Sequence, residues 1–121
     1  MSKRKDEREY QYHIIYAIDY RGNNDDVLTF VFEGAIWESI TSVFRFLCCP
    51  NGIAQGFTQY EEHAPKWRQK KGYRRIAVEI NQPNFDFASL DDMRILVESR
   101  LQAEMNCKIT YYKDYEEFIN Q

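Results

Sequence analysis

Tyr10-Gln-Tyr-His-Ile-Ile-Tyr-Ala-Ile-Asp-Tyr20 is the stretch of sequence from which the fold can be worked out. Every second residue in it is aromatic or aliphatic, which is the period of a pleated strand with one apolar face. We therefore predict a strand whose inward row is Tyr12, Ile14, Tyr16 and Ile18. The turn-forming residues 21–26 and the β-branched and aromatic residues 27–32 come next, and they extend this strand into an antiparallel hairpin.

The hairpin is followed by the apolar spacing of a helix. The stripe repeats at i, i+4, i+7, i+8 and i+11 and consists of Ile36, Ile40, Val43, Phe44 and Leu47. We expect a helix over residues 35–49, which Pro50-Asn51-Gly52 ends. Residues 51–72 contain three glycines, a proline and no sustained period, so we predict a long functional or mobile loop there, with at most a short element around 57–62.

The second half of the chain predicts one strand, one helix and one further strand. Residues 73–80 alternate as a strand does, and Asn81-Gln-Pro-Asn84 interrupts the pattern. Ser89, followed three residues later by Asp92, resembles a capping box, and helical spacing continues behind it to residue 106. Residues 107–112 predict the last strand, and Asp114 would cap a closing turn over 115–119.

This order of elements predicts an α+β fold. We expect a two-layer sandwich in which two helices cover one face of a four-stranded, mostly antiparallel sheet, in the order ββαβαβ. The length of 121 residues suits a single domain over residues 1–121. Residues 1–9 are almost all charged, so they are expected to form a flexible N-terminal tail.

Composition excludes several classes of protein. Aromatic residues make up 16% of the chain at a net charge of -3, which rules out a disordered polyelectrolyte. No apolar run approaches the roughly 18 residues of a membrane span, and no apolar stretch follows the basic N-terminus as in a secretory signal. We therefore expect a cytoplasmic protein without a membrane partner, while the oligomeric state stays open.

The cysteines predict reduced thiols. Cys48, Cys49 and Cys107 are odd in number and lack the C-x-x-C spacing of a zinc site. The sequence therefore predicts neither a metal nor a cofactor.

Basic residues gather in one segment. Six of the 16 lysines and arginines lie between residues 66 and 75 without an acidic residue among them, and the rest of the chain has 10 basic against 19 acidic residues. Such residues neutralise phosphates, and interleaved aromatic rings stack on unpaired bases. The alternative is a solvated loop that pairs with the protein's own carboxylates. The predicted binding residues are Lys66, Trp67, Arg68, Lys70, Lys71, Tyr73, Arg74 and Arg75.

Acidic residues also cluster along the chain, at Asp25-Asp26, Glu61-Glu62, Asp91-Asp92 and around Asp114, Glu116 and Glu117. The helix dipole explains the pair at 91–92, because anions are favoured in the first turn. The others would form an acidic face that meets a basic partner or mimics a nucleic-acid backbone, with exposed aromatic side chains as anchors.

Catalytic motifs are absent from the sequence. There is no phosphate-binding loop, dinucleotide fingerprint, zinc-protease helix or nucleophile elbow. Glu61-Glu62-His63 is the triplet that most resembles a catalytic group, since His63 could act as a base in a small nuclease. His13 falls in the middle of the first strand, where we expect a hydrogen-bonded sheet residue. No catalytic residue is predicted, and we do not expect an enzyme.

The sequence therefore favours a small non-enzymatic interaction module that binds a larger protein and inhibits or neutralises it, as immunity proteins and phage inhibitors do. That analogy rests on size and composition alone. The alternative is a module that binds RNA or single-stranded nucleic acid through residues 66–75. Whether the basic segment or the acidic aromatic face is the binding surface stays open.

Overall fold

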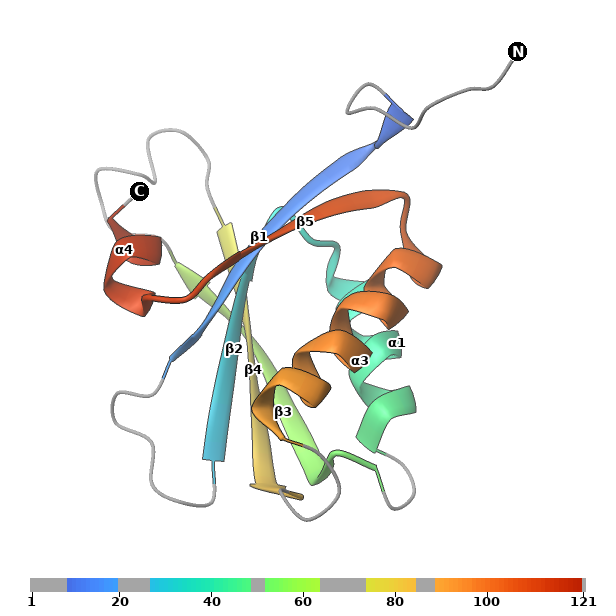
Figure 1. Ribbon diagram of the computed structural model, residues 1–121, viewed down its shortest axis with the longest axis vertical. Helices are drawn as coiled ribbons and strands as arrows, with labels where there is room; N and C mark the ends of the chain where they lie inside the picture. The colour runs from blue at the N-terminus through green and yellow to red at the C-terminus, as the bar shows by residue number, and fades with distance from the viewer. Residues whose placement is uncertain (1–8, 20–26, 49–51, 64–73, 85–88, 121) are drawn as a thin grey trace.

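The computed structural model describes residues 9–19, 27–48, 52–63, 74–84 and 89–120 (Figure 1). Their elements follow in the order β1 (Tyr12–Asp19), β2 (Val27–Glu33), α1 (Trp37–Cys48), β3 (Ala54–His63), β4 (Arg74–Pro83), α3 (Leu90–Glu104), β5 (Cys107–Tyr112) and α4 (Tyr115–Ile119). The fold is α+β, as predicted.

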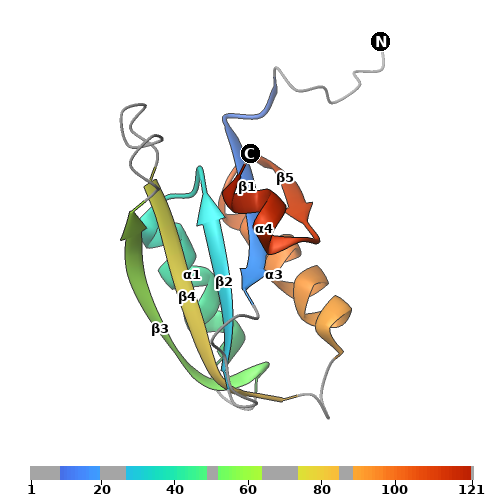
Figure 2. The same ribbon diagram turned by 90° about the vertical axis from the view of Figure 1, so that its left-hand side faces the viewer.

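The strands form one five-stranded sheet in the order β3-β4-β2-β1-β5, which Figure 2 shows from the side of α4. Neighbouring strands are antiparallel except β1 and β5, which run parallel with Ile14 opposite Ile109. The predicted four-stranded, mostly antiparallel sheet is therefore corrected to a mixed sheet of five strands. The additional strand, β3, lies within residues 51–72, which were predicted to be a loop.

β3 was not predicted because it is an edge strand with few apolar residues. Its side chains alternate between the faces, but only Ala54 and Phe57 of this strand belong to the main core or pack on it. Gln59 instead forms hydrogen bonds with α1: its Nε2 donates to the carbonyl of Trp37 at 2.9 Å, and its Oε1 accepts from Thr41 Oγ1 at 2.8 Å. A strand held by polar contacts of this kind shows no hydrophobic period.

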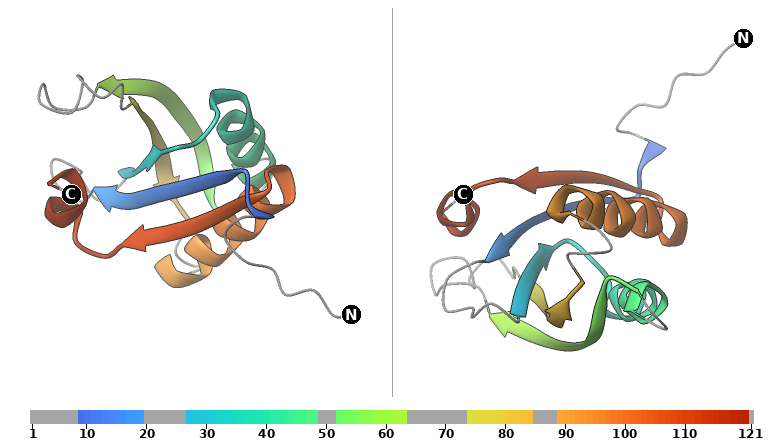
Figure 3. Two further views of the ribbon diagram at one scale, coloured as in Figure 1. Left: turned by 90° about the horizontal axis from the view of Figure 1, so that it is seen from above. Right: turned by 60° about the horizontal axis from the view of Figure 1, so that its bottom comes forward.

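α1 and α3 cover one face of the sheet, which we call the helix face (Figure 3). Four aromatic side chains fill the middle of this core, with Tyr16 and Phe32 ring centroids 5.2 Å apart and Phe30 and Phe44 centroids 5.5 Å apart. Ile14, with no exposed surface, belongs to the same core. The prediction that this row of the first strand faces the helices is confirmed.

The third helix, α4, lies on the opposite face, which we call the open face (Figure 2). Phe118 and Tyr115 pack there on three small buried residues of the central strands, Ala17, Val31 and Ala77. The prediction of two helices on one face is thus corrected by a third on the other side. The predicted cap is confirmed, because Asp114 Oδ1 accepts from the backbone N–H of Glu116 at 2.9 Å.

Local signals explain where the longer helices begin. α1 starts two residues later than predicted, after Gly34, whose φ is 86° and whose added Cβ would lie 2.4 Å from the carbonyl oxygen of His13. Ser89 is the N-cap of α3, as predicted, and its Oγ accepts from the backbone N–H of Asp92 at 3.3 Å. Among the described helices, none has the length and apolar character needed to cross a membrane.

A buried ion pair joins the end of β2 to the beginning of β4 on the open face. Arg75 Nε donates to Glu33 Oε2 at 2.7 Å, and the side chains are 2% and 3% exposed. The two residues are opposite each other on β4 and β2, and the Arg75 guanidinium lies 5.0 Å from the ring centroid of Phe118 in α4. The ion pair therefore joins two central strands and the helix that covers them.

Removing one member of this pair should destabilise the protein strongly. Glu33→Leu or Arg75→Met alone leaves an unpaired buried charge, which costs about 3–5 kcal/mol of unfolding free energy. The double variant should lose clearly less than the sum of the two single losses, because both charges are then gone. Urea denaturation of the wild type, the two single variants and the double variant measures the four free energies of unfolding. Additive losses would show that the two side chains do not interact.

Candidate functional site

Beside α4, the described part of the open face carries carboxylates around one exposed tyrosine. Tyr60 and Glu62 of β3, Glu79 of β4 and Asp19 of β1 point to this face, as the strand register requires. We call these four residues the acidic tyrosine surface. They come from three different strands, so folding is what brings them together.

Tyr60 is at the centre of this surface. Its hydroxyl donates to Glu79 Oε2 at 3.0 Å, and the residue remains 37% exposed. Partial burial raises the pKa of Tyr60 to about 12, with further contributions from the hydrogen bond to Glu79 and from the charges of Glu79, Glu62 and Asp19. The phenol therefore stays protonated and offers an aromatic contact inside a negative field.

Two residues at the end of the basic segment are described, and they differ in their exposure to solvent. Arg74 is exposed, and its Nη1 lies 3.1 Å from Glu61 Oε2 on the neighbouring strand. Arg75 is in the interior with Glu33, so its guanidinium is not displayed to solvent. The other predicted binding residues lie outside the described part of the chain, namely Lys66, Trp67, Arg68, Lys70, Lys71 and Tyr73. The prediction for this segment stays a prediction.

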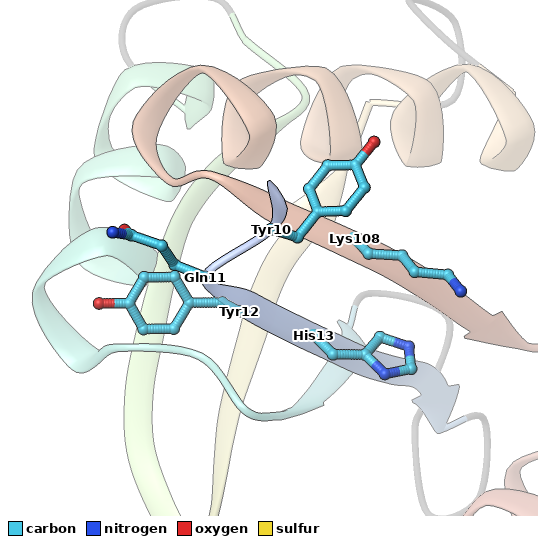
Figure 4. A pocket seen from close by; sticks show the side chains of 5 residues that line it. All are labelled: Tyr10, Gln11, Tyr12, His13 and Lys108. Atoms are coloured by element: carbon cyan, nitrogen blue, oxygen red, sulfur yellow. The ribbon is translucent and has the colours of Figure 1, made fainter. Parts of the chain in front are cut away.

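His13 lies beside a depression of about 170 Å³ where β1 begins, lined also by Tyr10, Gln11, Tyr12 and Lys108 (Figure 4). Its Nε2 is 2.9 Å from Thr110 Oγ1 on β5, so the expectation of a hydrogen-bonded sheet residue is confirmed. In Figure 4, Gln11 and Tyr12 point to one side and His13 and Lys108 to the other. Side chains that diverge in this way do not converge on one ligand.

The thiols and carboxylates of the described residues do not gather into a metal site. Cys48 and Cys107 are buried, and burial raises the pKa of the Cys107 thiol. Over the described ranges, no three side chains of histidine, cysteine, aspartate or glutamate lie together as metal ligands would. The side chain of His63 is outside the described residues.

Sequence reasoning found Glu62 but missed its contribution to a surface with Tyr60. The pairing of Tyr60 with Glu79 depends on β3, which was expected to be a loop. One signal was present: Thr58, Tyr60 and Glu62 alternate with Phe57, Gln59 and Glu61, and threonine and tyrosine favour strands. The resulting arrangement can attract a cationic surface and place an aromatic ring against it.

The pKa of Tyr60 is a direct test of this geometry. We expect Glu79→Gln to lower it from about 12 towards the ordinary value of 10.0, because the nearest carboxylate charge is removed. NMR titration of the tyrosine ring carbons measures it, with Tyr60→Phe to assign the resonance. In the wild type, the raised pKa means that the stability linked to this phenol is present below pH 10 and is lost as the pH rises towards 12. An unchanged pKa in Glu79→Gln would contradict the contact.

Comparison with known proteins supplies no family for this site. No protein-family model matches the chain, and neither a curated protein nor a solved structure matches it. Function must therefore be inferred from the residues described above.

Proposed function

We propose that this protein is a small non-enzymatic interaction module that binds a larger protein partner and inhibits or neutralises it. The observation that carries the proposal is the acidic tyrosine surface on the open face. Tyrosine is enriched where protein interfaces are energetically important, because its ring buries a large area at a low cost in side-chain entropy. The surrounding carboxylates select a partner whose contact surface is basic.

The same charges suggest how inhibition would occur. Asp19, Glu62 and Glu79 come from different strands of one rigid sheet, so their spacing is set before the partner arrives. A preformed negative field accelerates association with a basic surface. A partner covered at that surface can no longer bind a polyanion there, which makes a nucleic-acid-binding protein the kind of target that fits best.

The proposal is tested with a variant of the surface and a matched control. Tyr60→Ala combined with Glu79→Gln removes the ring and its carboxylate, whereas Glu38→Gln removes one exposed charge from α1 on the helix side. Immobilised wild-type protein and the control should retain the same partner from lysate of the native host, and the double variant should lose it. With the purified partner, the association rate should fall about tenfold and the dependence on salt should flatten.

Two further measurements separate the alternatives. A polyanion such as heparin should displace the partner from the wild-type protein and abolish the inhibition of its activity. A fluorescent single-stranded oligonucleotide tests the alternative function. If it binds the wild type at low salt and its affinity falls steeply as salt rises, a module that binds nucleic acid is favoured instead. Retention of the same partner by all three proteins would exclude the acidic tyrosine surface as the binding site.

A further inference from the structure

A cavity of about 540 Å³ lies on the helix face between the beginning of α3 and the end of β5. Leu90, Asp91 and Arg94 of α3 line one side, and Tyr111 and Lys113 line the other. The helix and the strand meet at their short connection and diverge from it, as Figure 1 shows, and the cavity occupies the wide end. We call this feature the α3–β5 groove. It is on the other side of the sheet from the acidic tyrosine surface, so it is a second site.

The arginine in the groove is held in a fixed position. The Arg94 guanidinium lies 3.7 Å from the ring centroid of Tyr111, and its Nε donates to the hydroxyl of Tyr16 at 3.3 Å. That hydroxyl in turn donates to Glu98 Oε2 at 2.5 Å, and Arg94 Nη2 contacts the same oxygen at 3.3 Å. A guanidinium already ordered by an aromatic ring and a buried phenol loses little side-chain entropy when it binds a carboxylate.

The third nitrogen of the Arg94 guanidinium, Nη1, is weakly engaged. This atom lies 3.4 Å from Asp91 Oδ1, at the long end of the hydrogen-bond range, and the Asp91 side chain is 83% exposed. An exposed pair of this kind contributes little, so an incoming carboxylate could replace Asp91. Lys113 stands across the cavity as a second cation.

The strand beside the groove is at the edge of the sheet. Within the described part of the chain, β5 pairs with β1 and with no other strand. The backbone N–H of Tyr12 donates to the carbonyl of Asn106, and peptide groups alternate in direction along a strand. The N–H and C=O groups of Ile109 and Tyr111 therefore point away from β1, towards the position that a further strand would occupy.

Charge indicates what kind of strand fits. The cavity is lined by two cations, Arg94 and Lys113, against one carboxylate, Asp91, although the protein as a whole has a net charge of -3. Lysines on an edge strand discourage indiscriminate pairing, whereas opposite charges on facing strands stabilise a pair. Alternate side chains of an added strand would point to the helix face, where one of them would enter the cavity.

We propose that the α3–β5 groove binds an acidic, extended segment of a partner protein, which adds to the edge of β5 and places a carboxylate between Arg94 and Lys113. This is the mode in which backbone hydrogen bonds supply affinity and a side-chain pocket supplies specificity. The aliphatic wall of Leu90 and the ring of Tyr111 accommodate the stem of a glutamate or aspartate side chain.

The test is a selection from a random dodecapeptide library displayed on phage, with the full-length protein as bait. Selected peptides should be rich in β-branched residues and carry an acidic residue at a fixed position. Lys113→Glu should weaken their binding about tenfold, since an attraction becomes a repulsion. Lys108→Glu is the matched control, because it makes the same charge change at the other end of β5 and on the open face, and it should change binding little.

Two variants and one exchange measurement make the result specific. Asp91→Asn should tighten binding about twofold, because the competing carboxylate is removed. Arg94→Lys keeps the charge but loses the planar donor fork, and it should weaken binding even though the protein remains folded. On saturation with a selected peptide, amide hydrogen exchange should slow at Ile109 and Tyr111, while the amide of Lys108, which points to β1, should be unaffected.

Three outcomes would overturn the proposal. The first is that no peptide is selected, or that the selected peptides have no acidic residue in common. The second is that Lys113→Glu and Lys108→Glu weaken binding equally. The third is that analytical ultracentrifugation shows a dimer and that amide exchange at β5 becomes faster when the dimer is diluted to monomers, which would assign the edge to a second copy of this chain. None of these results bears on the acidic tyrosine surface, which has its own variants.

Discussion

The buried pair of Glu33 and Arg75 is the constraint that the rest of the open face must satisfy. Two charges out of water remain stable only while they face each other, so the register of β2 against β4 is fixed at this point. The pair also needs a cover, and Phe118 of α4 supplies it. Among the described residues nothing accepts a hydrogen bond from Arg75 Nη2, which makes the exclusion of water by α4 more important still.

This constraint decides which part of the sheet is left for binding. α4 occupies the open face above Ala17, Val31 and Ala77, whose small side chains leave room for its two aromatic rings. The strands β3 and β4 extend beyond it, and there Tyr60 and Glu79 remain at the surface. The acidic tyrosine surface thus lies next to the ion pair and to α4, since Glu62 is opposite Arg75 in the strand register.

The sequence predicts the elements that bury apolar rows and fails where polar contacts decide. The row of Ile14 and Tyr16, the cap at Ser89 and the turn capped by Asp114 were all readable from spacing alone. β3 could not be predicted in this way, because Gln59 holds it to α1 by hydrogen bonds, and such contacts leave no hydrophobic period in the sequence. Arg75 was grouped with its basic neighbours because a run of charges does not reveal that one member faces Glu33, 42 residues earlier in the chain. The parallel pairing of β1 with β5 could not be predicted from local sequence patterns either, because the two strands lie at opposite ends of the fold.

The two edges of the sheet differ in a way that follows from the connections of the chain. At β3, Phe57 packs on Phe44 with ring centroids 6.0 Å apart and Gln59 bonds to α1, so the space between edge and helix is filled. At β5, only Met105 and Asn106 separate the strand from α3, so helix and strand are forced together at that end and splay apart at the other. Arg94 stacks on Tyr111 at the splayed end and leaves a cavity with Arg94 on one side and Lys113 on the other. An added strand would therefore find a side-chain pocket beside β5, whereas the corresponding space beside β3 is already taken by the protein's own residues.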